Sequence, residues 1–141
     1  MIRNKKLPEN ILNLIPKVEA LLKDQQVVMF AYLFGGLARS KVFPLSDIDV
    51  AVYLEEGSEF ATCKLNILGK LMAALGTDEI DLVILNTAPL TLRIRVISNK
   101  KVLVDKNPPL RYSFESLVLR EHFDFSKKEE ELFKRRFSIG R

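Results

Sequence analysis

The residues of this chain that are best suited to chemistry are three carboxylates and two glycines beside apolar runs. Gly35 and Gly36 follow one apolar run, Asp47 and Asp49 open a second, and Asp81 opens a third. The backbone N–H groups of a glycine turn can approach phosphate closely, and Mg²⁺ prefers carboxylate oxygens as ligands. This combination predicts a phosphate-binding turn that faces a divalent-metal site, as an enzyme acting on nucleotides requires.

The spacing of the acids predicts how they converge. In an extended segment over 47–54, Asp47 and Asp49 share one face and project their carboxylates in the same direction, about 7 Å apart along the backbone. If the strand that carries Asp81 is adjacent, a third carboxylate completes a site for one or two ions. Two metals stabilise both the attacking and the leaving oxygen of a displacement at phosphorus. Asp81 is then the candidate to bind the metal nearer the nucleophile and to take or orient its proton.

The glycine turn has a matching role. If a helix begins near Leu37, its N-terminus and the Gly36 N–H would hold a triphosphate, and Arg39 or Lys41 could neutralise further charge. Each feature also has a purely structural interpretation: a tight turn at the glycines, an Asx-turn before the second run, and a cap or edge-strand charge for the third acid. The ten residues between Gly36 and Asp47, and the position of all three acids at strand starts, favour the metal site.

Hydrophobic periodicity predicts the elements that position these residues. An almost wholly apolar run over 27–34 predicts a buried strand, and alternation over 47–54 predicts a strand with one core face. Pro16 interrupts the helical pattern of 8–24, which predicts two short helices or a kink. The other predicted elements are helices over about 59–75, 89–97 and 109–136, strands over 80–85 and 102–104, and a C-cap at Gly76. The order predicts one α+β domain over 1–141, a small mixed sheet with helices packed on one face.

The composition is that of a globular domain. Of the 141 residues, 48% are hydrophobic and 28% are charged, and no apolar run approaches the roughly 20 residues needed to span a bilayer. Pro8 and Glu9 follow the basic start of the chain, where a signal peptide would need an apolar stretch. The single Cys63 excludes an internal disulfide, so these features together predict a cytoplasmic protein. The net charge of +4 is mild, and no motif predicts direct binding of nucleic acid.

The glycines and the paired acids resemble the signature of a known family. Gly35 and Gly36, ten residues, and then Asp47 and Asp49 are similar to the Gly-Ser-x10-Asp-x-Asp pattern of the polymerase-beta-like nucleotidyltransferase superfamily. Three longer stretches resemble the minimal (MNT) branch of that superfamily: 33–40, 81–97 and 114–125.

This resemblance implies a site and a function. It implies a mixed sheet with flanking helices, ATP as the substrate, and two Mg²⁺ ions. It implies metal binding and catalysis by Asp47, Asp49 and Asp81, and nucleotide binding by Gly35, Gly36, Arg39 and Ser40. Many members of the minimal branch are antitoxins that pair with a HEPN-domain ribonuclease toxin and neutralise it by transferring AMP from ATP to a toxin tyrosine. The expected function is therefore that of a protein adenylyltransferase and antitoxin.

Two positions depart from the family pattern. Gly36 stands where the signature has serine, and Ser40 stands where a glycine often follows. A lost hydrogen bond to a charged phosphate oxygen costs about 1.5–3 kcal/mol, or one to two decades in rate. Retention of all three acids favours an active site. Two alternatives stay open: a binding-only antitoxin that masks its toxin, and a nucleotidyltransferase for a small hydroxylated molecule such as an antibiotic.

Other residues that could do chemistry are interpreted structurally. His122 is expected on a helix face or at an interface, and Cys63 as a small buried apolar residue. Tyr53 shares a strand face with Asp47 and Asp49. It is expected either to form the floor of the nucleotide site or to pack on the sheet. The phenylalanines after 113 are expected to be mostly core, with part of them available to dock a partner.

Overall fold

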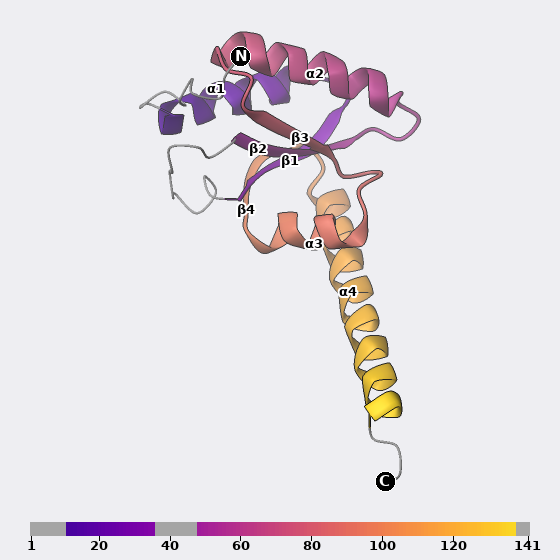
Figure 1. Ribbon diagram of the computed structural model, residues 1–141. Helices are drawn as coiled ribbons and strands as arrows, with labels where there is room; N and C mark the ends of the chain where they lie inside the picture. The colour runs from indigo at the N-terminus through magenta and orange to yellow at the C-terminus, as the bar shows by residue number, and fades with distance from the viewer. Residues whose placement is uncertain (1–10, 36–47, 138–141) are drawn as a thin grey trace.

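The computed structural model describes residues 11–35 and 48–137, which form four helices and one four-stranded sheet (Figure 1). The elements in chain order are α1 (Ile11–Asp24), β1 (Val28–Phe34), β2 (Ile48–Leu54), α2 (Phe60–Leu75), β3 (Ile80–Ile84), α3 (Leu90–Ser98), β4 (Lys100–Asp105) and α4 (Pro108–Phe137). The strand order is β3-β2-β1-β4. Strand β1 is antiparallel to both of its neighbours, whereas β2 and β3 are parallel and are joined through α2. The predicted α+β class and mixed sheet are confirmed.

Local signals place the ends of α2 and of the strands close to where the sequence predicts them. Gly76 ends α2 in the left-handed conformation, with φ 70°, and its N–H donates to the Met72 carbonyl. This confirms the predicted C-cap, because glycine adopts that conformation without the steric cost that a Cβ brings. Strand β4 is longer than predicted, because its exposed first half pairs with the end of β1 and needs no apolar pattern.

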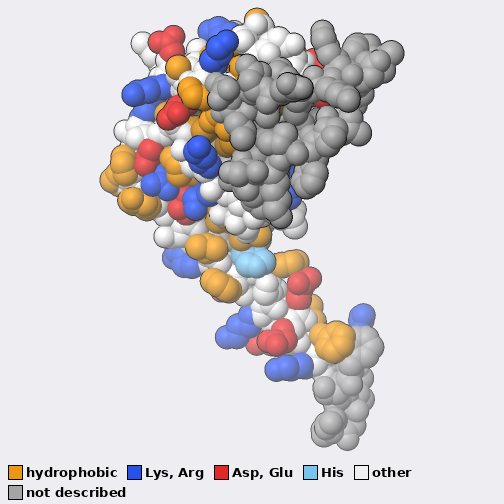
Figure 2. Space-filling view, turned by 90° about the vertical axis from the view of Figure 1, so that its left-hand side faces the viewer, with side chains coloured by type: hydrophobic (Ala, Val, Ile, Leu, Met, Phe, Trp, Pro, Cys, Tyr) orange, Lys and Arg blue, Asp and Glu red, His pale blue; other side chains and the backbone are white. Residues whose placement is uncertain are grey.

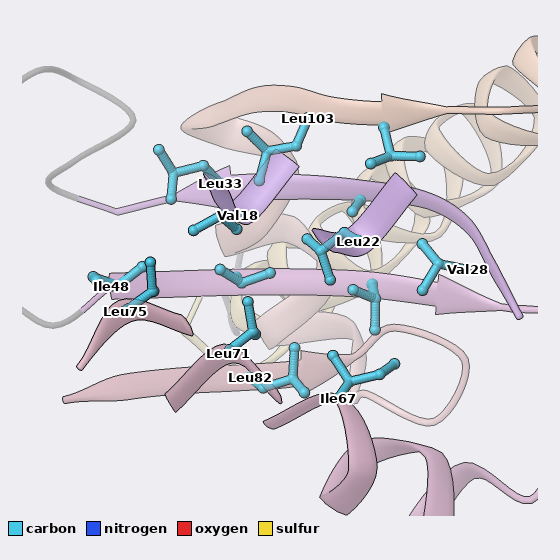
Figure 3. Close-up of a cluster of buried hydrophobic side chains, with 14 of the residues drawn as sticks. Val18, Leu22, Val28, Leu33, Ile48, Ile67, Leu71, Leu75, Leu82 and Leu103 are labelled. Atoms are coloured by element: carbon cyan, nitrogen blue, oxygen red, sulfur yellow. The ribbon is translucent and has the colours of Figure 1, made fainter. Parts of the chain in front are cut away.

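Strand β1 lies in the middle of the sheet and is buried on both faces. Ala31 and Leu33 belong to a core cluster with α1 and α2, whereas Tyr32 and Phe34 belong to a second cluster with α3 and α4. Figure 3 shows the first cluster, to which all four strands and both helices contribute. The predicted cover of helices on one face is therefore corrected: two helices lie on each face (Figure 1). The reason is that an apolar strand without alternation must be covered on both sides.

Helix α1 is a single helix with Pro16 inside it, so the interpretation as two short helices is wrong. An interior proline removes one helical hydrogen bond and costs about 3 kcal/mol. Three side chains of α1 (Leu14, Val18 and Leu22) are buried against the sheet, and each contributes roughly 1.5–3 kcal/mol. Their burial outweighs the cost of the proline, whose own ring points to solvent.

A partly buried polar network anchors the start of α4 to the sheet. The Tyr32 hydroxyl donates to Glu115 at 2.5 Å, and Arg111 pairs with Glu115 at 3.0 Å and with Asp105 at 2.9 Å. Burial, assisted by the Glu115 carboxylate, raises the pKa of Tyr32 above its usual value. Burial alone would lower the pKa of Arg111, but its bonds to Asp105 and Glu115 raise it overall. The network therefore fixes α4 against β1 and β4.

Beyond this anchor, α4 projects away from the body of the protein (Figure 1). Figure 2 shows hydrophobic and charged side chains interspersed along the projecting part. Its exposed apolar side chains are Phe123, Phe125, Leu132 and Phe133. No helix within 11–35 and 48–137 has both the length and the apolar character needed to cross a membrane.

Candidate active site

Two of the three predicted metal ligands lie side by side in the sheet. Asp49 of β2 and Asp81 of β3 are register partners in the parallel pair, so their carboxylates leave the same face of adjacent strands. Neighbouring strands are about 4.8 Å apart, which brings both carboxylates within reach of one ion. Asp81 was predicted to lie beside the paired acids, and the structure shows it beside one of them, Asp49.

Gly35 connects the glycine turn to this carboxylate pair. It follows β1 directly with φ 78°, a conformation that favours glycine. A Cβ at this position would lie 2.5 Å from Asp49 Oδ2, so the backbone and the carboxylate are in van der Waals contact. A side chain here would displace the carboxylate. The other predicted site residues, Gly36, Arg39, Ser40, Lys41 and Asp47, lie outside the described residues.

The donor set fits Mg²⁺. Asp49 and Asp81 supply two carboxylates at one end of the sheet, and a magnesium ion takes only one or two carboxylates together with water and phosphate oxygens. Within the described ranges no group of three or more metal-binding side chains is assembled. The third acid of the predicted set, Asp47, precedes the first described residue of β2.

Two cations that the sequence analysis did not select also lie at this end of the sheet. Phe34 pairs with Asp49 on one side and with Lys100 on the other, so Asp81, Asp49, Phe34 and Lys100 form a row across four strands. The Arg95 guanidinium of α3 lies 6.0 Å from the centre of the Phe34 ring. Two acids and two cations therefore lie at the same end of the sheet. The signal for Arg95 was its spacing of three from Leu92, which places both on one side of α3.

A pocket of about 650 Å³ opens beside Asp81, between α2 and α3 along β3. Its polar lining includes Asp81, Lys64, Thr87 and Arg95, and the rest of the wall is largely apolar. The pocket has the size of a small-molecule or peptide subsite, and it adjoins the acid proposed to face the nucleophile.

Side-chain bonds to the backbone fix the far end of β3 and the start of α3. Asn86 donates to the Leu54 carbonyl at 2.9 Å and accepts from the Leu54 N–H at 2.8 Å, which continues the ladder between β2 and β3. Arg93 donates to the carbonyls of Leu85 and Asn86 at 3.1 and 3.0 Å and lies over the Phe114 ring. These bonds hold α3, and with it Arg95, at a defined position beside the acids.

The remaining candidate residues have structural roles in the described part of the chain. Tyr53 stacks on Phe30 with ring centres 4.8 Å apart and contacts Phe114, so it packs on the sheet. It lies four residues along β2 from Asp49, roughly 13 Å away. Cys63 is half-buried against the core of α1 and α2, and His122 lies on α4 beside the Phe123 ring.

The fold is that of a nucleotidyl-transferring domain, and a family comparison agrees. Residues 16–109 match the model of the family described as polymerase beta, nucleotidyltransferase. The chain belongs to this nucleotidyltransferase family.

Solved structures show the same fold. A chain of a toxin–antitoxin with AMP-PNP is 23% identical, with a TM-score of 0.71 over 86% of this chain and 96% of that one. A chain of the tri-AMPylated Shewanella oneidensis HEPN toxin in complex with MNT antitoxin is 22% identical, with a TM-score of 0.66 over 87% and 96% of the two chains. A putative minimal nucleotidyltransferase is 25% identical, with a TM-score of 0.53 over 66% and 92%. A comparison with curated protein sequences finds no match.

Proposed function

We propose that this protein is a Mg²⁺-dependent nucleotidyltransferase that moves AMP from ATP to a tyrosine hydroxyl of a cognate HEPN-domain toxin in the cytoplasm. The observation that carries the proposal is the register pair of Asp49 and Asp81 with Gly35 packed against Asp49. Because Gly35 has no Cβ, its backbone lies directly against the Asp49 carboxylate, and the Asp81 carboxylate leaves the same face of the neighbouring strand.

The residues have distinct roles in the proposed reaction. Asp49 and Asp81, with Asp47, would hold Mg²⁺, which neutralises phosphate charge when it is bound. The acceptor oxygen forms a bond to the α-phosphorus, and the bond from that phosphorus to the bridging oxygen breaks and releases pyrophosphate. Asp81, on the edge strand, takes or orients the acceptor proton. Gly35 and Gly36 would leave the backbone accessible to the phosphates, and Arg39 and Ser40 follow them closely in the sequence. The Arg95 guanidinium lies 6.0 Å from the ring centre of Phe34, the residue before Gly35.

Helix α4 supports a protein partner for the chain. Phe125 and Leu132 are 51% and 62% exposed and follow the buried Val118 at intervals of seven residues. The apolar side of α4 therefore continues past Phe125, which lines a pocket with Leu90 and Ile94 of α3, to Leu132 beyond the body of the protein. We assign this surface to contact with the HEPN-domain partner, which accords with the complexes in which the similar folds occur.

The same surface also favours a second candidate, a binding-only antitoxin. A partner held by α4 would be masked whether or not AMP is transferred, and Gly36 lacks the hydroxyl of the family signature. The small-molecule alternative gains less support. The pocket beside Asp81 is lined by Lys64 and Arg95, which disfavours a cationic antibiotic.

The test combines the purified protein, Mg²⁺, ATP labelled on either the α- or the γ-phosphate, and the HEPN-domain protein encoded beside it. Transfer of the α label alone establishes adenylyl transfer. Asp49→Asn and Asp81→Asn are expected to lower the rate by about a thousandfold, because each removes a charge worth several kcal/mol at the transition state. Asp78→Asn, in the exposed turn before β3, is the matched control and keeps the wild-type rate.

Neutralisation of the toxin by Asp49→Asn at wild-type potency, with no label transferred by the wild type, would instead establish the binding-only antitoxin.

A further inference from the structure

Strand β3 presents an open edge beside the proposed catalytic acids. It is an outermost strand, and within the described part of the chain β2 is its one neighbour in the sheet. The Ile48 N–H donates to the Glu79 carbonyl, and the Leu85 N–H donates to the Val52 carbonyl. Odd-numbered residues of this segment therefore bond inward to β2. Because backbone groups alternate along a strand, the N–H and C=O of Ile80, Leu82 and Ile84 point outward.

The 650 Å³ pocket runs along this open edge. Leu82, Val83 and Ile84 form its floor, although their side chains are almost fully buried in the core. The lining that these residues offer is therefore largely backbone. Phe60 and Ala61 of α2 form one wall, and α3 with the segment before it forms the other. From Ile80 to Ile84 the edge is about 13 Å long, enough for an extended segment of roughly five residues.

The charged residues that line the pocket favour particular side chains in such a segment. Lys64 and Arg95 are exposed cations in the lining, and Asp81 is the one acid among the lining residues. Neither cation has a carboxylate partner among the ion pairs of the described residues. A peptide segment with acidic side chains is complementary in charge to these walls. The hydroxyl group of an acceptor residue in that segment would lie near Asp81, at the start of β3.

We propose, resting on the proposed adenylyl transfer, that an extended acidic segment of the acceptor protein adds as a fifth strand to the outer edge of β3 and so delivers its tyrosine hydroxyl to Asp81. Directly opposed side chains of neighbouring strands share one face. A tyrosine placed opposite Asp81 thus emerges on the face where Asp49 and Asp81 lie. Main-chain bonds give affinity in this mode of recognition, and the lysine and arginine select acidic flanks.

Backbone methylation of a peptide tests the strand pairing directly. The probe is a fluorescent nine-residue peptide with one central tyrosine flanked by glutamates, and its binding is measured by fluorescence anisotropy. One peptide carries N-methyl groups at the tyrosine and at the residues two positions away, and the other carries them on the residues adjacent to the tyrosine. Only alternate amides of an added strand face β3, so one peptide is expected to lose about tenfold in affinity and the other less than about twofold. Which peptide loses affinity reports whether the added strand is parallel or antiparallel.

Substitutions in the pocket wall provide the matching test on the protein. Ala61→Trp fills the groove and is expected to weaken peptide binding about tenfold or more, whereas Ala73→Trp, exposed on the same helix outside the pocket, leaves it unchanged. Lys64→Glu weakens binding of the acidic peptide, and Lys70→Glu on α2 does not. Binding of AMP-PNP, measured by calorimetry, stays at the wild-type value in all four variants.

The outcomes separate this proposal from the proposed function. A period-two methylation pattern without transfer of the α label supports the peptide edge and overturns adenylyl transfer. Equal affinity of the two methylated peptides, absence of peptide binding, or wild-type transfer to the HEPN protein by Ala61→Trp overturns the peptide edge and leaves adenylyl transfer standing.

Discussion

Gly35 combines two constraints that can be separated experimentally. Its φ of 78° is unfavourable for most residues with a side chain, and a Cβ would meet Asp49 Oδ2 at 2.5 Å. Gly57 has φ 88° with no atom within 4 Å of a Cβ, so it carries the first constraint alone. The comparison of these two glycines isolates the contact with the carboxylate.

We expect Gly35→Ala and Gly57→Ala each to lower the free energy of unfolding by about 1–2 kcal/mol, the cost of left-handed backbone for alanine. Only Gly35→Ala is expected to reduce AMP transfer, by about a hundredfold, because the methyl group displaces the Asp49 carboxylate, which we propose binds the metal. Urea denaturation and α-label transfer measure the two effects. Equal activity of both variants would contradict the role assigned to the contact.

The carboxylate pair was predictable because acids at the starts of two strands lie at the same end of a sheet when those strands are parallel. The sequence did not determine that β2 and β3 are neighbours in exact register, since that depends on the crossover through α2. Arg95 and Lys64 were missed for the same reason. A single cation on an amphipathic helix is normally solvated, and only the packing of α2 and α3 around β3 brings these two into one pocket.

The attachment of α4 to the sheet is expected to be sensitive to alkaline pH. Burial raises the pKa of Tyr32 above its unfolded value of 10.0, so the unfolded state loses this proton first. Its stabilising contribution is complete below pH 10 and is lost as the pH rises above that value. Burial also raises the pKa of Tyr53, and this adds to the same loss.

Tyr32→Phe is expected to lower stability by about 1–2 kcal/mol at pH 8, because Glu115 loses a donor but keeps Arg111. The variant should then lose less stability than the wild type between pH 9 and about 11. Denaturant unfolding at several pH values measures this, with Tyr112→Phe, exposed on the same helix, as the control. Parallel curves for Tyr32→Phe and the wild type would contradict the assignment.

Elements were predictable where one local signal dominates. The apolar run of β1 and the glycine after α2 gave their positions almost to the residue. Pro16 gave a wrong prediction of two short helices. The free energy that proline costs inside a helix is outweighed by the burial of Leu14, Val18 and Leu22, and this burial depends on the sheet beneath them. Because the apolar residues of β1 do not alternate with polar ones, helices were to be expected on both faces of the sheet. Which helices cover which face could be assigned only from the strand order.

The projecting part of α4 does not contribute side chains to the core of the protein. The sequence predicts a helix here, but phenylalanine spacing does not show where the body ends. Helix α4 leaves the sheet after Val118, so Phe125 and Leu132 remain outside the core.

We expect Phe125→Asp and Leu132→Asp each to weaken binding of the proposed HEPN-domain partner by about tenfold or more, because each places a charge in an apolar contact. Folding should be unaffected, since both side chains are exposed. Leu65→Asp, on α2 and 72% exposed, is the control. Surface plasmon resonance measures the affinities, and wild-type binding by both α4 variants would assign the partner contact elsewhere.

The register of Asp49 with Asp81 carries a thermodynamic consequence for the whole fold. Like charges placed directly opposite on neighbouring strands destabilise a sheet, so the register that brings these two carboxylates together also lowers the stability of the fold. Asp81→Asn should therefore unfold at a higher temperature than the wild type in the presence of a chelator. Added Mg²⁺ should raise the melting temperature of the wild type and leave that of the variant nearly unchanged. The paired carboxylates thus lower the stability of the protein in exchange for activity, and a bound divalent ion restores the stability that was lost.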